Sequence, residues 1–170
     1  MELYNEKIFA LFLGFISVIL PIVFYFLSRT NKILDCEISS NTIIDITKDG
    51  QIGHKLEVFY DKEPISKLDL VNLKLYNTGS APVSSKDFET DISIQFSQNA
   101  KIFEPEIIEN KQNINPEITV NDNSILIKPF LLNKGENIEI QTLISGFIKN
   151  DIHVISRIVG CKIKLKTKKD

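Results

Sequence analysis

Residues 67–76 read KLDLVNLKLY, and apolar and polar residues alternate along this stretch. A period of two is typical of a β-strand with one buried and one solvated face, because successive side chains point to opposite sides of a sheet. The same alternation recurs in LEVFY (56–60), ISIQF (92–96), ILIK (125–128), NIEIQ (137–141) and KIKLK (162–166). The sequence therefore predicts several half-buried strands.

Turn-forming residues separate these stretches. They are Asp-Gly (49–50), Asn-Thr-Gly (77–79), Asn-Pro (115–116), Asn-Asp-Asn (121–123) and Asn-Lys-Gly (133–135). Such residues take a positive φ at low cost or bond to their own backbone, so they reverse the chain, and we expect a positive φ at Gly79 and Gly135. Roughly eight to ten strands with no helical crossovers predict an all-β antiparallel sandwich or small barrel over residues 33–170.

The N-terminal region has a different pattern. Residues 8–27 read IFALFLGFISVILPIVFYFL and carry no charge. At about 1.5 Å per residue this run spans roughly 30 Å, the thickness of the bilayer hydrocarbon. The preceding residues 1–7 lack a basic n-region and FLSRTN lacks a cleavage site, which disfavours a secretory signal. We therefore expect one transmembrane helix over residues 8–28, followed by a linker over 29–32.

Basic residues flank this segment unequally. Lys7 stands on the N-terminal side, whereas Arg29, Lys32 and Lys48 follow the segment. The positive-inside rule then places the C-terminal domain in the cytoplasm of a single-pass protein of the bacterial cell membrane. Two cysteines, Cys36 and Cys161, are expected to be reduced thiols there, whereas a domain on the other side could join them in a disulfide.

Small or helix-distorting residues recur within the apolar segment. Ala10, Gly14, Ser17 and Pro21 are separated by four, three and four residues, which places them on one face of a helix, and Ser28 continues that face. Helices in lipid associate through close approach at small residues rather than through the hydrophobic effect. This stripe predicts a homo-oligomer, although a chance alignment of small residues in a plain anchor gives the same pattern.

Composition limits the function classes. The chain has 170 residues and a net charge of −2, so no basic field favours a nucleic-acid polymer as partner. No nucleophile elbow, zinc-protease or phosphate-loop motif is present, and His54 and His153 have no neighbours at metal-ligand spacing. Nothing in the local sequence pairs Ser84 or Ser85 with a base. We expect no enzymatic activity, no cofactor and no metal.

Charged residues near the predicted strands suggest two further roles. Lys162, Lys164, Lys166 and Lys168 share one face of the last strand, which is typical of a solubilising edge but also suits an anionic ligand or anionic lipid headgroups. Asp87 is interpreted as a turn residue that accepts backbone N–H groups, with ligand binding as the alternative. The acids Glu104, Glu106 and Glu109 predict a charged strand edge rather than a metal site.

Three short motifs carry a resemblance to a known class of proteins. They are Asn77-x-Gly79-x-x-Pro82-Val83, Asp87-Phe88 and Leu132-Asn133-x-Gly135-Glu136. In these features, which cover about half of the predicted β-domain, the chain resembles small bacterial membrane-anchored proteins that carry an immunoglobulin-like β-domain. The resemblance implies an immunoglobulin-like sandwich. Some cytoplasmic β-domains on membrane spans sense a nucleotide signal as effectors of anti-phage defence; these typically carry two spans, whereas this chain has one.

The leading hypothesis from the sequence is a non-enzymatic, membrane-anchored interaction or sensor module. Its expected partners are the lipid bilayer, further copies of the chain, and a protein or small anionic ligand. The alternative is a membrane-acting defence effector whose β-domain binds a nucleotide signal and rearranges its clustered spans. A structural subunit of a larger membrane complex is a third hypothesis.

Overall fold

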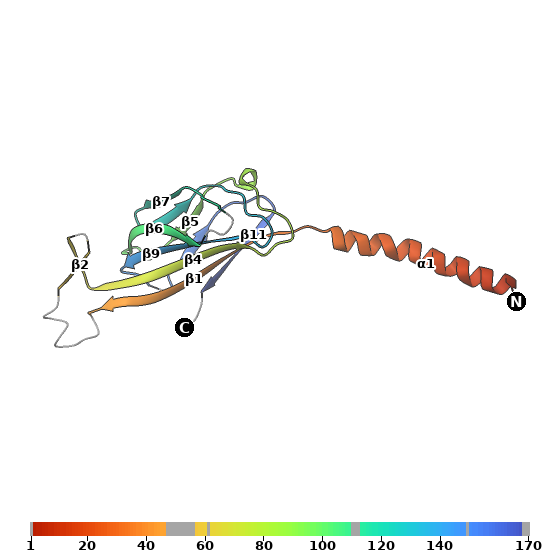
Figure 1. The fold of residues 1–170 in the computed structure, drawn as a ribbon, viewed down its shortest axis with the longest axis horizontal. Coiled ribbons are helices and arrows are strands. Elements are labelled where there is room, and N and C mark those ends of the chain that lie inside the picture. The colour runs from red at the N-terminus through yellow and green to blue at the C-terminus, as the bar shows by residue number, and fades with distance from the viewer. Residues whose placement is uncertain (1, 47–56, 61, 110–112, 149, 168–170) are drawn as a thin grey trace. The chain divides into compact units, whose positions relative to one another are not determined.

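The computed structural model describes residues 2–46, 57–60, 62–109, 113–148 and 150–167. The chain divides into two compact units, Met1–Thr30 and Asn31–Asp170. The first contains a single helix, α1 (Glu2–Ser28), and the second contains the strands (Figure 1). The fold is therefore mostly β with one N-terminal helix. The helix begins six residues earlier than the predicted segment.

Helix α1 exposes apolar side chains in every direction. The large apolar side chains between Leu11 and Phe26 are each 40–67% exposed. Ser17 and Ser28 donate their hydroxyl hydrogens to carbonyls three residues earlier, and Pro21 lies inside the helix. Within the described part of the chain, no helix meets the length and apolarity required to cross a membrane. Ile8, Phe9 and Leu27 belong to the predicted span, but their side chains lie outside the described residues.

The larger sheet of the β unit has five strands in the order β11-β1-β4-β9-β6. Their bounds are β11 (Cys161–Thr167), β1 (Lys32–Asp45), β4 (Lys67–Asn77), β9 (Asn137–Ser145) and β6 (Lys101–Glu109). All neighbours are antiparallel except β1 and β11, which are parallel. The expectation of a purely antiparallel fold is therefore wrong for the last strand. Alternation within a strand indicates its buried face but carries no information about the direction of its neighbour.

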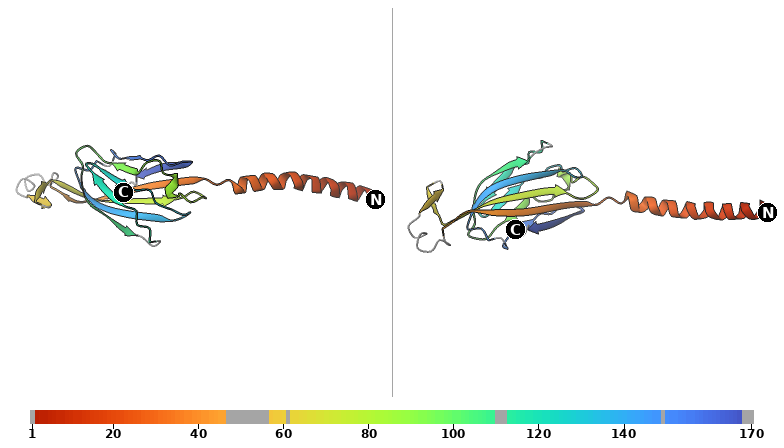
Figure 2. Two further views of the ribbon diagram at one scale, coloured as in Figure 1. Left: turned by 90° about the horizontal axis from the view of Figure 1, so that it is seen from above. Right: turned by 60° about the horizontal axis from the view of Figure 1, so that its bottom comes forward.

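The smaller sheet has the order β10-β5-β8-β7, and a separate hairpin pairs β2 with β3. Their bounds are β10 (His153–Ile155), β5 (Ile92–Gln95), β8 (Ser124–Ile127), β7 (Ile118–Asn121), β2 (Val58–Tyr60) and β3 (Glu63–Ile65). Figure 2 shows the arrangement of the strands from two further directions. Each of the six alternating stretches overlaps a strand, so those predictions are confirmed; the described strands number eleven rather than eight to ten.

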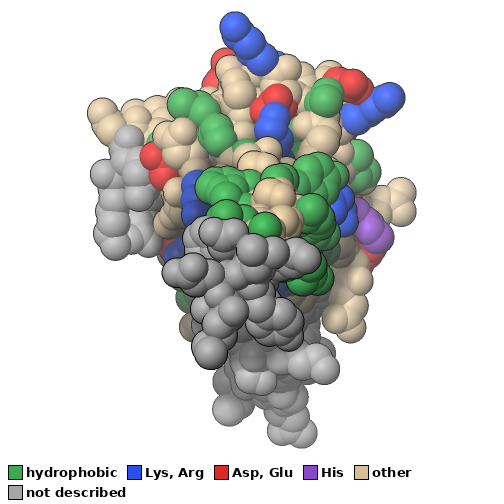
Figure 3. Space-filling view, turned by 90° about the vertical axis from the view of Figure 1, so that its right-hand side faces the viewer, with side chains coloured by type: hydrophobic (Ala, Val, Ile, Leu, Met, Phe, Trp, Pro, Cys, Tyr) green, Lys and Arg blue, Asp and Glu red, His purple; other side chains and the backbone are tan. Residues whose placement is uncertain are grey.

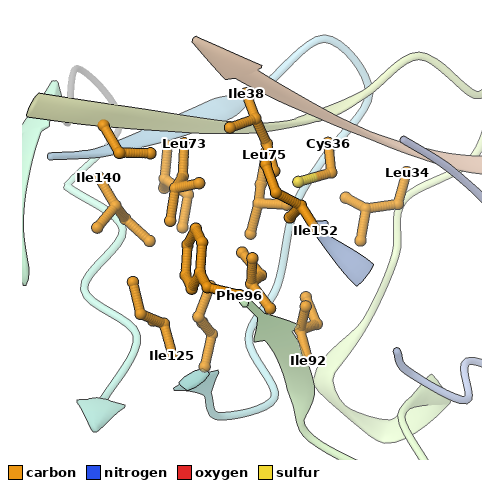
Figure 4. Packing of buried hydrophobic residues seen from close by; sticks show 14 of the residues in the cluster. Leu34, Cys36, Ile38, Leu73, Leu75, Ile92, Phe96, Ile125, Ile140 and Ile152 are labelled. Atoms are coloured by element: carbon orange, nitrogen blue, oxygen red, sulfur yellow. The ribbon is translucent and has the colours of Figure 1, made fainter. Parts of the chain in front are cut away.

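One hydrophobic core joins the two sheets. Leu73 and Ile140 of the larger sheet and Ile92 and Ile125 of the smaller sheet are fully buried in the same cluster (Figure 4). In β9 the alternate residues from Ile138 to Ile144 are buried, as a one-sided strand requires. The other face of the larger sheet is predominantly polar, and strand ends and turns lie at both ends of the unit.

Candidate functional site

The three sequence motifs meet at the end of the β unit where β1 begins. Val83 pairs with Leu132 in an isolated bridge, and Phe88 pairs with Ile158. The Asn77 side-chain amide donates to the carbonyls of Ala81 and Leu132 at 2.8 and 3.0 Å. We call this end, formed by residues 77–88, 131–136 and 157–161, the junction end. The motifs are distant in sequence and form one hydrogen-bonded cluster.

The same cluster holds the residue at which the chain enters the β unit. Asn31 donates its N–H to the Ser80 hydroxyl at 2.9 Å, and its carbonyl accepts from the Ser80 and Ala81 N–H groups. The N–H of Thr78 donates to the carbonyl of Ile33 at 3.0 Å. The sequence did not predict a role for Asn31, because no local pattern indicates a hydrogen-bond partner 49 positions away. These bonds fix the chain three residues after the end of α1.

Gly79 is required at this position for a reason that differs from the expected one. It does not adopt a positive φ, whereas Gly135 does, with φ of 78°. A Cβ at Gly79 would lie 2.5 Å from the Asn31 carbonyl oxygen and 2.7 Å from the Ile33 nitrogen. The positive φ predicted for Gly79 is therefore wrong. Close backbone approach excludes a side chain there, and only the folded partner segment creates that constraint.

Asp87 organises the turn beside this cluster. Its carboxylate accepts the Ser84 N–H at 2.7 Å and completes a capping box around the short helix Ser85–Asp87. The turn-acid role is as predicted. The structure adds an ion pair to Lys32 at 2.6 Å, which ties β1 to the same turn. The hydrogen bond from Lys32, followed by that from Ser84, lowers the pKa of Asp87 below its usual value.

Replacing Asp87 by alanine is expected to lower the free energy of unfolding by about 1–2 kcal/mol, because a cap and a charged hydrogen bond are lost. The Asp87→Asn substitution keeps the shape of the side chain but removes its charge, and about half of the loss is expected. Folding lowers the pKa of Asp87, so its negative charge stabilises the folded state fully above the unfolded pKa of about 4. This stabilisation is lost as pH falls through the lower pKa of the folded state. Urea unfolding at neutral and acidic pH tests this, and a wild-type to Asp87→Asn difference that does not shrink in acid would contradict it.

Asp35 and Lys166 form a second polar contact, on the outer face of the larger sheet. Asp35 is only 2% exposed, and its Oδ2 accepts from the Lys166 ammonium at 2.5 Å. Lys166 also contacts the Tyr76 hydroxyl at 3.0 Å and lies 5.4 Å from the centre of the Tyr76 ring. The Asp35 contact, followed by that of Tyr76, raises the pKa of Lys166 above its usual value. This ion pair links β11, the last strand, to β1, the first.

The lysines of the predicted row on the last strand do not all have the same role. The register opposes Lys162 and Lys164 to Ile33 and Asp35, and both lysines are exposed without an ion-pair partner among the described residues. Lys166 is occupied by Asp35. Lys168 lies outside the described residues. Of the three lysines of this row that the structure describes, Lys162 and Lys164 therefore remain available.

Replacing Lys166 by methionine is expected to lower Tm more than replacing Lys164 by methionine. Lys164 is an exposed lysine of the same strand without a partner among the described residues, whereas removal of Lys166 leaves the buried Asp35 carboxylate uncompensated. Adding Asp35→Asn to the Lys166→Met variant removes the uncompensated charge, so part of the loss should be recovered. Thermal unfolding followed by circular dichroism checks both effects, and equal Tm values for the two lysine variants would contradict the role of the pair.

The two cysteines lie on neighbouring strands but at different positions along them. Cys36 is opposite Leu165, and Cys161 is opposite Lys32, so they are four register positions apart. That offset corresponds to about 13 Å along parallel strands, too far for a disulfide without rearrangement of the backbone. Both are free thiols in the structure. Burial raises the pKa of Cys36 to about 12 and is also the main cause of a raised pKa at Cys161.

The remaining candidate groups are placed apart. His153 is exposed on β10 with Asp151 3.6 Å away, and His54 lies outside the described residues. The Ser84 hydroxyl accepts from the Lys86 N–H in the capping box. Among the residues the structure describes, no group of three His, Cys, Asp or Glu side chains is arranged to hold a metal ion.

A polar cleft of about 240 Å³ lies beside β6. Tyr60 and Phe103 contact each other at one side, with tilted rings whose centres are 4.4 Å apart, and Glu104 and Glu106 also line the cleft. β6 is an edge strand with an irregular register between Phe103 and Glu106, and Glu104 has φ of 30°. This irregularity agrees with the expected charged edge; the side chain of Glu109 lies outside the described residues.

Gly14, one residue of the predicted stripe, lines an apolar groove on α1. The groove has a volume of about 470 Å³ and is lined by Leu11, Gly14, Phe15, Val18 and Ile19. A Cβ at Gly14 would meet no atom within 4 Å. Ala10, Ser17 and Pro21 are helical at the predicted positions, so helix geometry keeps them on the same face as Gly14.

The chain was compared with known proteins. No family model matches it, and no curated protein sequence matches it either. The site is therefore interpreted from its own residues.

Proposed function

We propose that this protein is a membrane-anchored, non-enzymatic interaction or sensor module, with α1 in the bilayer and the β unit at the cytoplasmic face. The observation that carries the proposal is the exposure of the apolar side chains of α1. Large side chains such as Phe12, Phe15 and Phe24 project from different sides of the helix and remain exposed. A helix that is apolar all round requires a lipid or protein environment, since water would solvate it poorly.

The sequence supports the lipid environment. The uncharged run over residues 8–27 has the length of a bilayer span, and Arg29 and Lys32 follow it at once. Exposed aromatic rings, Tyr25 among them, near the end of the run suit the interface between hydrocarbon and headgroups. The excess of basic residues on the C-terminal side favours the cytoplasmic placement.

An immunoglobulin-like topology is part of the proposal. The order β1-β4-β9-β6 corresponds to strands A, B, E and D of that fold, and β5 and β10 pair as C and F do. The last strand departs from the constant-type arrangement, because β11 pairs with β1 instead of joining the C–F sheet. Such sandwiches present loops at their two ends for recognition, which is consistent with a binding module.

We also propose that the helices associate with further copies of the chain along the stripe that contains Gly14. The groove beside Gly14 is apolar and open, so a second helix could approach the backbone closely there. The Ser17 hydroxyl is bonded to the Gly14 carbonyl at 2.8 Å, which allows packing without an unpaired polar group. A second copy of the same helix is the occupant of matching length and character.

The defence-effector hypothesis receives less support from the described residues. A nucleotide signal would require basic groups around a cavity. The polar cleft is instead lined by Glu104 and Glu106, and Lys166 is already paired with Asp35. The interaction or sensor module therefore remains the preferred function.

The anchor and its orientation are tested with one preparation of cells. The full chain is expected to stay in the membrane pellet after alkaline carbonate extraction. A membrane-impermeant maleimide added to intact cells is expected to leave Cys36 and Cys161 unmodified, because the β unit is inside. As both native thiols are hindered, an exposed cysteine introduced by Lys164→Cys serves as the reporter of orientation, with cells opened before the reagent is added as the positive control.

Two outcomes would overturn parts of this proposal. Release of the chain by carbonate would contradict the membrane anchor. Labelling in intact cells to the level of opened cells would invert the orientation. The absence of a Cys36–Cys161 disulfide is expected in either orientation because of their register, so it does not decide between them.

A further inference from the structure

The junction end of the β unit exposes both basic and apolar side chains. Leu131 and Val159 are 50% and 55% exposed, although they flank buried core residues. Lys86 is exposed on the short helix and Lys134 on the turn before Glu136, and neither has an ion-pair partner among the described residues. Figure 3 views the molecule from this side, where basic side chains project and both acidic and hydrophobic side chains are exposed beside them.

The acidic groups at this end are already engaged. Asp87 pairs with Lys32, and Glu89 pairs with Arg157 at 2.5 Å. The carboxylate of Glu136 accepts the N–H of Asn133 at 2.7 Å and closes its own turn. Lys86 and Lys134 therefore remain without an ion-pair partner among the described residues, whereas Glu136 is hydrogen-bonded but keeps its negative charge. A basic and apolar combination suits an anionic lipid interface, where cations meet phosphates and aliphatic side chains meet the upper hydrocarbon.

Chain length determines which end of the β unit can reach the membrane. Asn31 is fixed to Ser80 and Ala81 by hydrogen bonds and follows the last residue of α1, Ser28, by three positions. Three residues span at most about 11 Å. If α1 ends at the bilayer surface, the junction end must therefore lie next to the headgroups. The opposite end, where β2 and β3 lie, is separated from it by the length of β1, which has 14 residues or roughly 45 Å.

We infer that the junction end is a membrane-contact surface that binds the anionic phospholipid headgroups around the anchor. Lys86 and Lys134 supply the charge, and Leu131 and Val159 enter the interface. The inference rests on the proposed membrane anchor and adds a second contact of the chain with the bilayer.

The test uses the absence of tryptophan from the chain. Val159→Trp and Phe59→Trp each introduce a single reporter at positions of matched exposure, 55% and 56%, at the two ends of the β unit. The full chain is reconstituted into vesicles of phosphatidylcholine alone or with phosphatidylglycerol, each containing brominated lipid that quenches tryptophan on contact. The Val159→Trp reporter is expected to be quenched about twofold more in the anionic vesicles than in the neutral ones, and the Phe59→Trp reporter equally little in both.

Charge-reversal variants distinguish lipid binding by this surface from nonspecific electrostatic attraction of the whole chain. Lys134→Glu is expected to abolish the extra quenching of the Val159→Trp reporter, whereas Lys62→Glu, an exposed turn lysine beside β3, should leave it unchanged. Equal quenching in neutral and anionic vesicles, or equal quenching of both reporters, would overturn the inference. A chain that resists carbonate extraction but shows no quenching at position 159 overturns the contact and keeps the anchor. Extraction by carbonate overturns the anchor itself.

Discussion

A Gly79→Val variant is expected to lose about 3 kcal/mol of unfolding free energy or more, the largest stability effect we predict for one substitution in the β unit. The Cβ would lie 2.5 Å from the Asn31 carbonyl oxygen and 2.7 Å from the Ile33 nitrogen, both backbone atoms. To make room, the chain must break the bonds from Thr78 to Ile33 and from Ser80 to Asn31. Urea unfolding of the full chain in detergent, followed by its strand circular dichroism signal, measures the loss.

Gly135→Val is the matched control, because it introduces the same side chain. Gly135 has φ of 78°, but a Cβ there meets no atom within 4 Å. Only backbone strain opposes the side chain, and about 1 kcal/mol is expected. Equal losses at the two glycines would show that close approach at Gly79 does not govern stability. A Gly79→Val variant as stable as the wild type would mean that the entry of the chain at Asn31 is not fixed as described.

A Gly14→Leu variant is expected to weaken association of the helices by about tenfold or more, the largest effect that we predict on assembly. The leucine side chain would fill the groove beside Leu11, Phe15, Val18 and Ile19 and keep a second helix away. In-membrane crosslinking, or a reporter of helix association, measures the effect on the full chain.

Phe12→Leu serves as the control because Phe12 is exposed on the side of the helix opposite the stripe and does not line the groove beside Gly14. It should change association little, since one large apolar side chain replaces another. Equal association of the Gly14→Leu and Phe12→Leu variants, or a monomeric wild type, would contradict the stripe and leave a plain anchor. Neither variant alters the β unit, so misfolding of that unit does not confuse the measurement.

The turns of the candidate site could be predicted from the sequence, but their assembly into one site could not. Asn77, Gly79, Asp87, Asn133 and Gly135 were recognised because turn chemistry is local. Their assembly into one end of the β unit depends on pairings across tens of residues, such as Val83 with Leu132. Asn31 had no local signal, and the exposure of Leu131 and Val159 follows only from the packing of residues beside them.

The burial of two acids illustrates the same limit. Asp69 is 2% exposed and accepts from the Thr42 hydroxyl at 2.6 Å, although its stretch reads as a simple alternating strand. Asp35 lies on the polar face of β1, as alternation indicates, yet Lys166 covers it from a strand that lies more than a hundred residues later in the chain. Periodicity assigns a face to each residue. Whether that face is open to water depends on which strand lies beside it.

The sequence by itself determined that the chain has an apolar N-terminal helix and a strand-rich unit, because the period of the hydrophobic pattern and the turn residues are local properties. It also placed Asp87 as a turn acid that accepts backbone N–H groups and Gly135 in a turn of positive φ. Only the tertiary structure decided that β11 runs parallel to β1, that the cysteines stand too far apart to pair, and that Gly79 is needed for close approach. These features arise from strand order and register, which are set by burying one shared core between two sheets, and no single stretch of sequence carries that information.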